Sequence, residues 1–292
     1  MSRTRSSSAL AHPRAFRTWV AWRPRRCHDR NARVVCTLAL FRNPGARWPL
    51  VVAANRDEFY QRPTGPPERL TSPSGAMVAG RDLEAGGTWL AWRGGDDPLV
   101  AGVLNRRSPE APIAAAGATS GARSRGALPL KAIAEPDLEH ALAACRREAD
   151  GPYGPFTLLL ADLERAVVLT NGARREPIDL PPGLTVLTNL ELNDPRCPRA
   201  ASARVDFARL EPLLDGSRPA REAVDALASV LSNHENSIDP DHPSPLARLC
   251  VHTSGYGTRS ATVLIARRDG RIEAYHADGP PCSAPLAALD RV

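Results

Sequence analysis

The chain has 292 residues, of which 42% are hydrophobic, enough for the core of one large domain or two small ones. It contains no apolar run of roughly 18 residues, so no transmembrane helix is expected. The net charge of +6 does not point to a nucleic-acid partner: the first 35 residues hold nine arginines and one acid, and the 29 basic and 31 acidic residues that follow nearly cancel.

Residues 1–35 are predicted to be a disordered, arginine-rich extension. They are also rich in serine and poor in acids, as organellar transit peptides are, and dense arginine gives salt-dependent affinity for phosphates. A third hypothesis is a misassigned translation start. The chain has one lysine against 37 arginines, a bias typical of GC-rich genomes, in which a GTG codon for Val35 could serve as a bacterial start. The product would then begin Met-Cys, and loss of the methionine would give Cys36 a free α-amine.

From Val34 the composition changes to short strands and turns. The apolar runs 34–41 and 49–55 predict two strands around a Pro-Gly turn, and 87–93 with 98–105 predict a second hairpin. Prolines and glycines in residues 61–75 predict an exposed loop between these hairpins.

Residues 127–149 have helical periodicity with a break at Glu135-Pro136. Residues 156–172 and 183–189 predict three more strands, and about 198–214 and 220–233 predict two helices. Residues 260–277 predict a final hairpin around Asp269-Gly270. This order favours an α+β domain of antiparallel sheets packed with helices, and we expect a single domain over residues 36–292.

The spacing of the six cysteines predicts neither a zinc site nor a disulfide framework, because positions 27, 36, 145, 197, 250 and 282 form no CxxC pair. We therefore expect no metal and no other cofactor, and a reducing cytoplasm as the location. The sequence also contains no GxGxxG, P-loop, GxSxG or HExxH motif.

The polar run Asn55-Arg56-Asp57-Glu58, at the end of the second predicted strand, is the strongest candidate site. A solvated turn with a salt bridge is the plainer interpretation. In an antiparallel hairpin, however, the start of the first strand lies beside the end of the second. Arg56 would then lie near Cys36, where its charge would lower the pKa of the thiol.

Six stretches in this order resemble the NRDE family, also called the transport and Golgi organisation protein 2 family: CTLALF, PLVVAANRDEFYQRPTGPP, AGRDLEAGGTWLA, GVLNRRSP, SRG and GYGTRSATVLI. The resemblance runs from Cys36 to the final hairpin. Family members typically begin Met-Cys, so residues 1–35 depart from the pattern. The family in turn resembles N-terminal nucleophile hydrolases of the penicillin V acylase and bile salt hydrolase type, which implies an αββα sandwich of two antiparallel sheets flanked by helices.

By position, the resemblance implies that Cys36 is the nucleophile and that Arg56 and Asp57 match, loosely, the arginine and aspartate of those enzymes. An N-terminal cysteine brings its own base, an α-amine with a pKa of roughly 7.7–8.0, and Asp57 would hold that amine by a charge-assisted hydrogen bond. The plainer interpretation of Cys36 is a buried strand cysteine.

The resemblance also implies roles for three residues farther along the chain. Asn105 stands where such enzymes place an oxyanion-hole asparagine, Asn189 resembles a second asparagine after a strand, and Arg259 resembles a late arginine before a strand. The asparagines could equally be turn residues, and Arg259 a surface residue.

The implied function is that of an N-terminal-cysteine amidohydrolase, a hydrolase of non-peptide C–N bonds that acts on a small acyl amide or related carbonyl compound. The alternative is a non-catalytic binding or trafficking protein on the same fold that handles haem, lipid or acyl-CoA. The expected partner in either case is a small-molecule substrate or ligand, with no nucleic acid and no membrane. The sequence specifies neither the substrate nor the oligomeric state.

Overall fold

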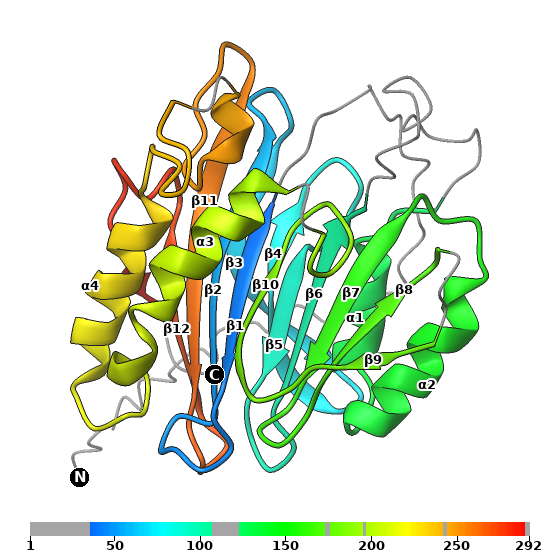
Figure 1. Ribbon diagram of the computed structural model, residues 1–292. Coiled ribbons are helices and arrows are strands. Elements are labelled where there is room, and N and C mark those ends of the chain that lie inside the picture. Colours follow the sequence, from blue (N-terminus) through cyan, green and yellow to red (C-terminus); the bar gives the residue numbers. More distant parts are fainter. Residues whose placement is uncertain (1–35, 107–122, 173–175, 195–196, 242–243, 290–292) are drawn as a thin grey trace, which may run out of the picture.

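The computed structural model describes residues 36–106, 123–172, 176–194, 197–241 and 244–289 (Figure 1). The predictions for residues 1–35 lie outside the described residues. The described elements form two antiparallel sheets with helices on their outer faces.

The first sheet has six strands in the order β10-β1-β2-β11-β12-β13. The adjacent strands β1 and β2 form the predicted first hairpin, and β11 and β12 form the predicted final one. A positive φ of 81° at Gly270 allows the tight turn between β11 and β12. The bounds are β1 Thr37–Arg42, β2 Leu50–Phe59, β10 Gly183–Leu187, β11 Tyr256–Ala266, β12 Ile272–Ala277 and β13 Ala287–Ala288.

The second sheet has seven strands that follow the chain order from β3 to β9. Neighbouring strands therefore pair as successive hairpins, with the long segment between β6 and β7 carrying two helices. The bounds are β3 Thr64–Ser72, β4 Gly75–Asp82, β5 Leu90–Arg93, β6 Leu99–Asn105, β7 Phe156–Ala161, β8 Ala166–Thr170 and β9 Ile178–Asp179.

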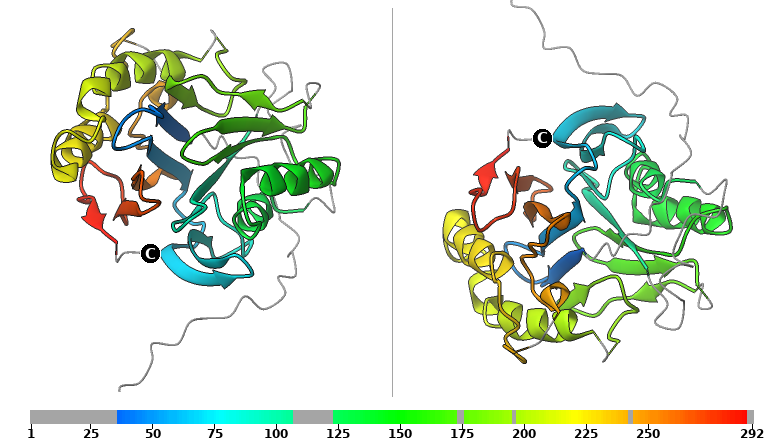
Figure 2. Two further views of the ribbon diagram at one scale, coloured as in Figure 1. Left: turned by 90° about the horizontal axis from the view of Figure 1, so that it is seen from below. Right: turned by 90° about the horizontal axis from the view of Figure 1, so that it is seen from above.

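Each sheet carries one pair of helices on its outer face, as the two end-on views show (Figure 2). Helices α3 and α4 cover the first sheet, and α1 and α2 cover the second. The break predicted at Glu135-Pro136 separates α1 from α2. The bounds are α1 Ala127–Ile133, α2 Leu138–Ala149, α3 Pro198–Ala208 and α4 Ala220–Leu231, with short 3-10 turns η2 at Glu211–Leu213 and η3 at Pro245–Ala247.

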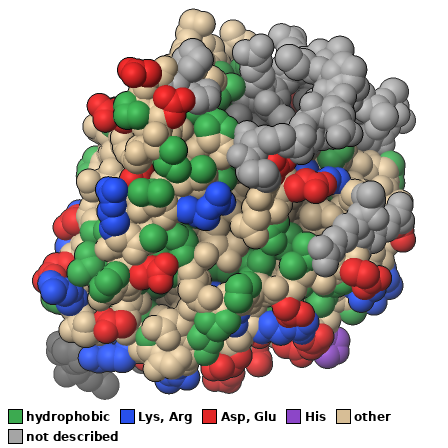
Figure 3. Space-filling model, in the orientation of Figure 1, with side chains coloured by type: hydrophobic (Ala, Val, Ile, Leu, Met, Phe, Trp, Pro, Cys, Tyr) green, Lys and Arg blue, Asp and Glu red, His purple; other side chains and the backbone are tan. Residues whose placement is uncertain are grey.

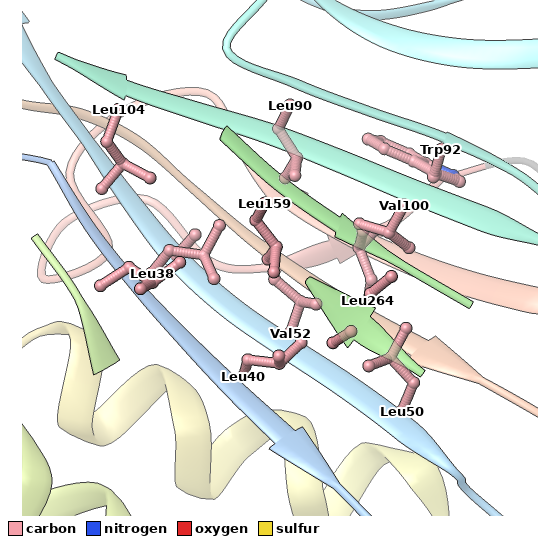
Figure 4. Close-up of a cluster of buried hydrophobic side chains, with 14 of the residues drawn as sticks. Leu38, Leu40, Leu50, Val52, Leu90, Trp92, Val100, Leu104, Leu159 and Leu264 are labelled. Carbon is pink, nitrogen blue, oxygen red and sulfur yellow. The ribbon is translucent and has the colours of Figure 1, made fainter. Parts of the chain in front are cut away.

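The central strands β1, β2 and β11 of the first sheet are buried on both faces, and side-chain alternation divides their residues between two cores. On β1, Leu38 and Leu40 point between the sheets, into the buried cluster that also holds Leu104 and Leu159 of the second sheet (Figure 4). Ala39 and Phe41 point the other way and pack against α3 and α4. The four layers are thus helices, sheet, sheet and helices, which confirms the predicted αββα sandwich.

The predicted loop over residues 61–75 is wrong, because most of it forms β3 and the start of β4. Two adjacent prolines, Pro66 and Pro67, argued for a loop. They are tolerated because β3 is an edge strand, where no hydrogen bond is needed on one side, and because the register with β4 shifts between Gly65 and Glu68.

None of the helices within the described residues is long and apolar enough to cross a membrane. On the face drawn in Figure 3, acidic and basic side chains are interspersed and hydrophobic ones lie between them.

Candidate active site

The candidate site lies at the end of the first sheet where β1 begins and β2 ends. The strands are antiparallel with Thr37 opposite Asn55. One step farther along this register, Cys36 stands opposite Arg56, so the hairpin brings the two residues together as the sequence predicted.

The same end of the sheet brings Asn189 next to Cys36 from the other side. Strand β10 pairs antiparallel with β1, with Leu187 opposite Leu38. Asn189, two residues past Leu187, therefore stands level with Cys36 and on the same face of the sheet. Its side chain is 2% exposed, and its Nδ2 donates to the main-chain oxygen of Asn105, which links the two sheets.

The Asn189 side chain has one polar atom that is not engaged. Its Oδ1 is buried and has no hydrogen-bond partner among the described residues. Asn105, by contrast, contributes its main-chain carbonyl to this contact. Because Leu104 of β6 points between the sheets, alternation directs the Asn105 side chain away from that space.

The Cys36 side chain is 6% exposed and faces the space between the sheets with Leu38 and Leu40. Its thiol donates to the main-chain oxygen of Asp57 over 3.7 Å. Burial, and then the charge of Asp57, raise the pKa of the Cys36 thiol to about 12, and Arg56 lowers it only in part. Arg56 thus lowers the pKa of the thiol as predicted, but burial and Asp57 outweigh it in the chain in which Cys36 is internal.

Arg56 and Glu58 continue the face of β2 that looks between the sheets, where Val52 and Ala54 also lie. Arg56 is 7% exposed, and its Nη2 lies 3.5 Å from Oε2 of Glu58. Its Nη1 is buried and has no hydrogen-bond partner among the described residues. Burial raises the pKa of Glu58, and the Arg56 guanidinium opposes that rise. The site thus holds a buried donor that is available to a ligand.

Asp57 lies on the opposite face of β2, toward α3. Its carboxylate accepts a hydrogen bond from Nη1 of Arg199 at 2.6 Å and another from Oγ1 of Thr258 at 2.7 Å. Burial raises the pKa of Asp57, while the Arg199 guanidinium and both hydrogen bonds favour the charged form. The predicted bond from Asp57 to an α-amine remains a prediction.

Sequence analysis missed Arg199 and Thr258, the two partners of Asp57. They lie 142 and 201 residues from it along the chain. The only local signal was an arginine on the predicted helix 198–214. Arg199 also donates to Oγ1 of Thr37, next to the candidate nucleophile.

Asn55 shares the helix-facing side of β2 with Asp57. It is fully buried, and its Nδ2 donates to the main-chain oxygens of Leu231 at 2.8 Å and Leu249 at 3.0 Å. Asn55 thus joins the first sheet to the end of α4 and to the segment before β11. The polar tetrapeptide is therefore divided: Asn55 and Asp57 hold the helix layer, while Arg56 and Glu58 face the space beside Cys36.

Arg259 sits in a β-bulge, because the register between β2 and β11 shifts between Thr258 and Ser260. Its Nη1 donates to the main-chain oxygens of Tyr60 at 2.6 Å and Phe59 at 3.3 Å. In this structure, then, Arg259 fixes the turn that follows β2, and its place on the bulge is next to the site.

Comparison with known proteins agrees with the sequence resemblance. Residues 35–278 match the family model described as "Transport and Golgi organisation 2". The chain belongs to this family. It is 32% identical over 250 residues to the transport and Golgi organization protein 2 homolog of Bos taurus, and the match covers 76% of this chain and 84% of the relative. The Homo sapiens homolog is 29% identical over 246 residues, with the same coverage.

The solved structures similar to this chain include the Caenorhabditis elegans ortholog of N-acylethanolamine-hydrolyzing acid amidase, and the match covers 87% of this chain and all of that one. The TM-score is 0.48 and the sequence identity is 13%.

In this member of the transport and Golgi organisation 2 family, the groups around Cys36 offer one thiol, one buried guanidinium donor and one buried amide acceptor. Among the described residues, a separate group that does not include Cys36 could hold a metal ion: His234, Cys250, His252 and Cys282.

Proposed function

We propose that this chain is a cysteine-nucleophile hydrolase that cleaves a small acyl amide. The observation that carries the proposal is a pair of buried atoms on either side of Cys36 that have no hydrogen-bond partner in the described part of the chain: the donor Nη1 of Arg56 and the acceptor Oδ1 of Asn189. An amide group presents the complementary pair, a carbonyl oxygen that accepts and an N–H that donates. Held between them, its carbonyl carbon would lie over the thiol.

Cys36 needs a base, because burial raises the pKa of the internal thiol to about 12 and leaves almost no thiolate at neutral pH. In a mature chain that begins at Cys36, its own α-amine supplies that base. All the described strands and helices lie between Thr37 and Ala288, so a chain starting at Cys36 retains every one of them.

The reaction then has two stages. The thiol proton passes to the α-amine, the sulfur bonds to the carbonyl carbon, and the electron pair of the C=O bond moves to oxygen, where Arg56 stabilises it. As the C=O bond re-forms, the C–N bond breaks and the leaving amine takes the proton from the α-ammonium. Water attacks the resulting thioester with the α-amine as base, which releases the carboxylic acid and restores the thiol.

The first test is the intact mass of the protein produced from its native gene with its own upstream region. A mass matching residues 36–292 supports the mechanism, because it gives a free N-terminal cysteine. A mass that includes residues 1–35 would contradict it, since no α-amine would then lie at Cys36.

The second test is Cys36→Ser, assayed with a series of fluorogenic acyl amides of different chain lengths. We expect turnover to be lost while the free energy of unfolding stays nearly unchanged. The matched control is Cys145→Ser, which alters another buried cysteine, in the core under α1 and α2, and should keep turnover. Equal activity of Cys36→Ser and wild type would refute a nucleophilic role.

A binding or trafficking role on the same fold is the second candidate. The near-complete burial of Cys36 and the raised pKa of its thiol in the internal chain favour it, and the names of the relatives refer to transport and Golgi organization. If the wild type and Cys36→Ser bind haem, a lipid or an acyl-CoA equally well, and neither turns over an amide, this alternative would replace the hydrolase.

A further inference from the structure

Two histidines and two cysteines from three separate segments meet at the end of the first sheet. His234 lies in the segment after α4, Cys250 and His252 lie just before β11, and Cys282 lies in the segment after β12. One ligand atom from each residue lies within 4.8 Å of every other. The yellow, orange and red segments that carry them gather on one side of the sandwich in Figure 1.

Three of the four ligand atoms already have the spacing of a tetrahedral site. Sγ of Cys250 lies 3.7 Å from Sγ of Cys282 and 3.6 Å from Nε2 of His252, and the His252–Cys282 distance is 3.3 Å. Zinc bonds of about 2.3 Å to sulfur and about 2.0 Å to nitrogen require tetrahedral edges of about 3.8 Å between sulfurs and about 3.5 Å between sulfur and nitrogen. All three observed distances are within about 0.2 Å of these edges.

His234 is placed to complete the set. Its ring lies beside that of His252, with centroids 5.1 Å apart. Its Nδ1 lies 3.3 Å from the main-chain oxygen of Cys250, to which it can only donate. In the neutral imidazole that binds metals, this hydrogen bond places the proton on Nδ1 and leaves Nε2 as the ligand atom, and a carbonyl partner on the far nitrogen is the usual way a histidine ligand is oriented.

We propose that His234, Cys250, His252 and Cys282 bind one zinc ion. Two thiolates and two imidazoles are a donor set that zinc favours, and four protein ligands close the coordination sphere. The ion would be structural, since no coordination position is left open for a substrate. It would join three segments: the one after α4, the one before β11 and the one after β12. The four ligands themselves lie outside the named helices and strands.

The proposed ion also connects to the candidate active site. Val251, between the two ligands Cys250 and His252, donates its main-chain N–H to Oγ1 of Thr258 at 2.9 Å. The Thr258 hydroxyl donates in turn to Asp57. Fixing residues 250–252 therefore fixes the threonine that holds Asp57. The zinc proposal itself does not depend on any hydrolase activity.

The test uses the full chain, purified under reducing conditions and dialysed against metal-free buffer. Mass spectrometry of the metals should find one zinc per chain. In Cys282→Ser and His252→Ala, two exposed positions whose substitution should not prevent folding, the affinity for zinc should fall more than about 100-fold, beyond the loss expected for a second-shell partner. The control variant Cys27→Ala/His28→Ala removes the cysteine–histidine pair of the N-terminal segment and should keep its zinc.

Replacement of zinc by Co²⁺ reports the ligands directly. Two thiolates in a tetrahedral field should give a thiolate-to-cobalt charge-transfer band, which should be about halved in Cys282→Ser. Wild-type protein without stoichiometric zinc, a cobalt spectrum without thiolate bands, or a Cys250–Cys282 disulfide in place of the metal would each overturn the proposal. Equal zinc in wild type and Cys282→Ser would do the same.

Discussion

The two faces of strand β2 use the same four-residue polar run in different ways. On the helix side, Asn55 and Asp57 are fully buried. The amide nitrogen of Asn55 and the carboxylate of Asp57 have hydrogen-bond partners, while Oδ1 of Asn55 has none among the described residues. On the inter-sheet side, Arg56 has one loose ion pair with Glu58 and a buried nitrogen with no partner among the described residues.

This difference distinguishes polar groups that hold the fold together from polar groups that are available to a ligand. Buried polar groups are normally satisfied by the fold, so an unsatisfied one beside a cysteine indicates a place for a ligand. On the other face, the Asn55 amide nitrogen and the Asp57 carboxylate are hydrogen-bonded and position the strand that carries Arg56. Three predictions test whether the two faces differ in this way.

The largest effect is expected from Arg199→Met on the helix side. The change leaves the Asp57 carboxylate buried without its charge partner, which should lower the free energy of unfolding by about 3–5 kcal/mol. Arg56→Met, on the inter-sheet side, should cost less than half of that, because Glu58 keeps a second arginine, Arg62, 3.7 Å away. Urea denaturation measures the free energy of unfolding of both variants.

The control for this comparison is Arg218→Met, which breaks an exposed pair with Glu222 on α4 and should change stability little. Equal losses for Arg199→Met and Arg56→Met would show that both faces are structural and would remove the distinction between them.

The next effect is expected in catalysis, from Asn189→Ala. If Oδ1 of Asn189 accepts the N–H of the scissile amide, its loss should reduce kcat for amides by about 10²–10³-fold, or about 2.7–4 kcal/mol, as for other preorganised groups at the reacting centre. The matching ester has no N–H to donate, so its kcat should fall much less. Steady-state kinetics with an amide and ester pair measure the difference.

Asn105→Ala is the matched control, because it keeps the main-chain carbonyl that Asn189 contacts. It should retain most of the amide activity. A larger loss in Asn105→Ala than in Asn189→Ala would instead favour Asn105, for which the family resemblance implies an oxyanion-hole role.

Much of the fold follows from local sequence. The β1–β2 and β11–β12 hairpins and the helix pair broken at Pro136 rest on periodicity and turn residues close in sequence, whereas the αββα sandwich was implied by the family resemblance. Strand β3 does not, because whether Pro66 and Pro67 are tolerated depends on its place at the edge of a sheet, which is a property of the whole topology.

The candidate site is predictable to the extent that it lies on one hairpin. Cys36 and Arg56 meet because adjacent strands pair. The partners of Asp57 come from α3 and β11, and only the tertiary fold brings them to it. The same holds for the histidine and cysteine cluster: cysteine spacing argued against zinc, yet Cys250 and Cys282 are brought together across 32 residues.

The smallest expected effect is in the alkylation rates of two cysteines, Cys36 and Cys145, which should be similar. Burial raises the pKa of both Cys36 and Cys145 to about 12. In the full chain, the two should therefore react with iodoacetamide at rates within about tenfold of each other. Because the thiolate fraction rises tenfold per pH unit below the pKa, both rates should rise steeply from pH 7 to pH 9 without a plateau.

In a chain that begins at Cys36, the alkylation rates of Cys36 and Cys145 should differ. Its α-ammonium places a positive charge beside the thiol, so the pKa should fall and alkylation of Cys36 should accelerate at pH 7 while that of Cys145 stays unchanged. Peptide mass spectrometry of the alkylated protein measures both sites in one sample. Fast reaction of Cys36 in the full chain would instead mean that Arg56 alone stabilises the thiolate. The inter-sheet face of β2 would then activate the nucleophile without a free N-terminus.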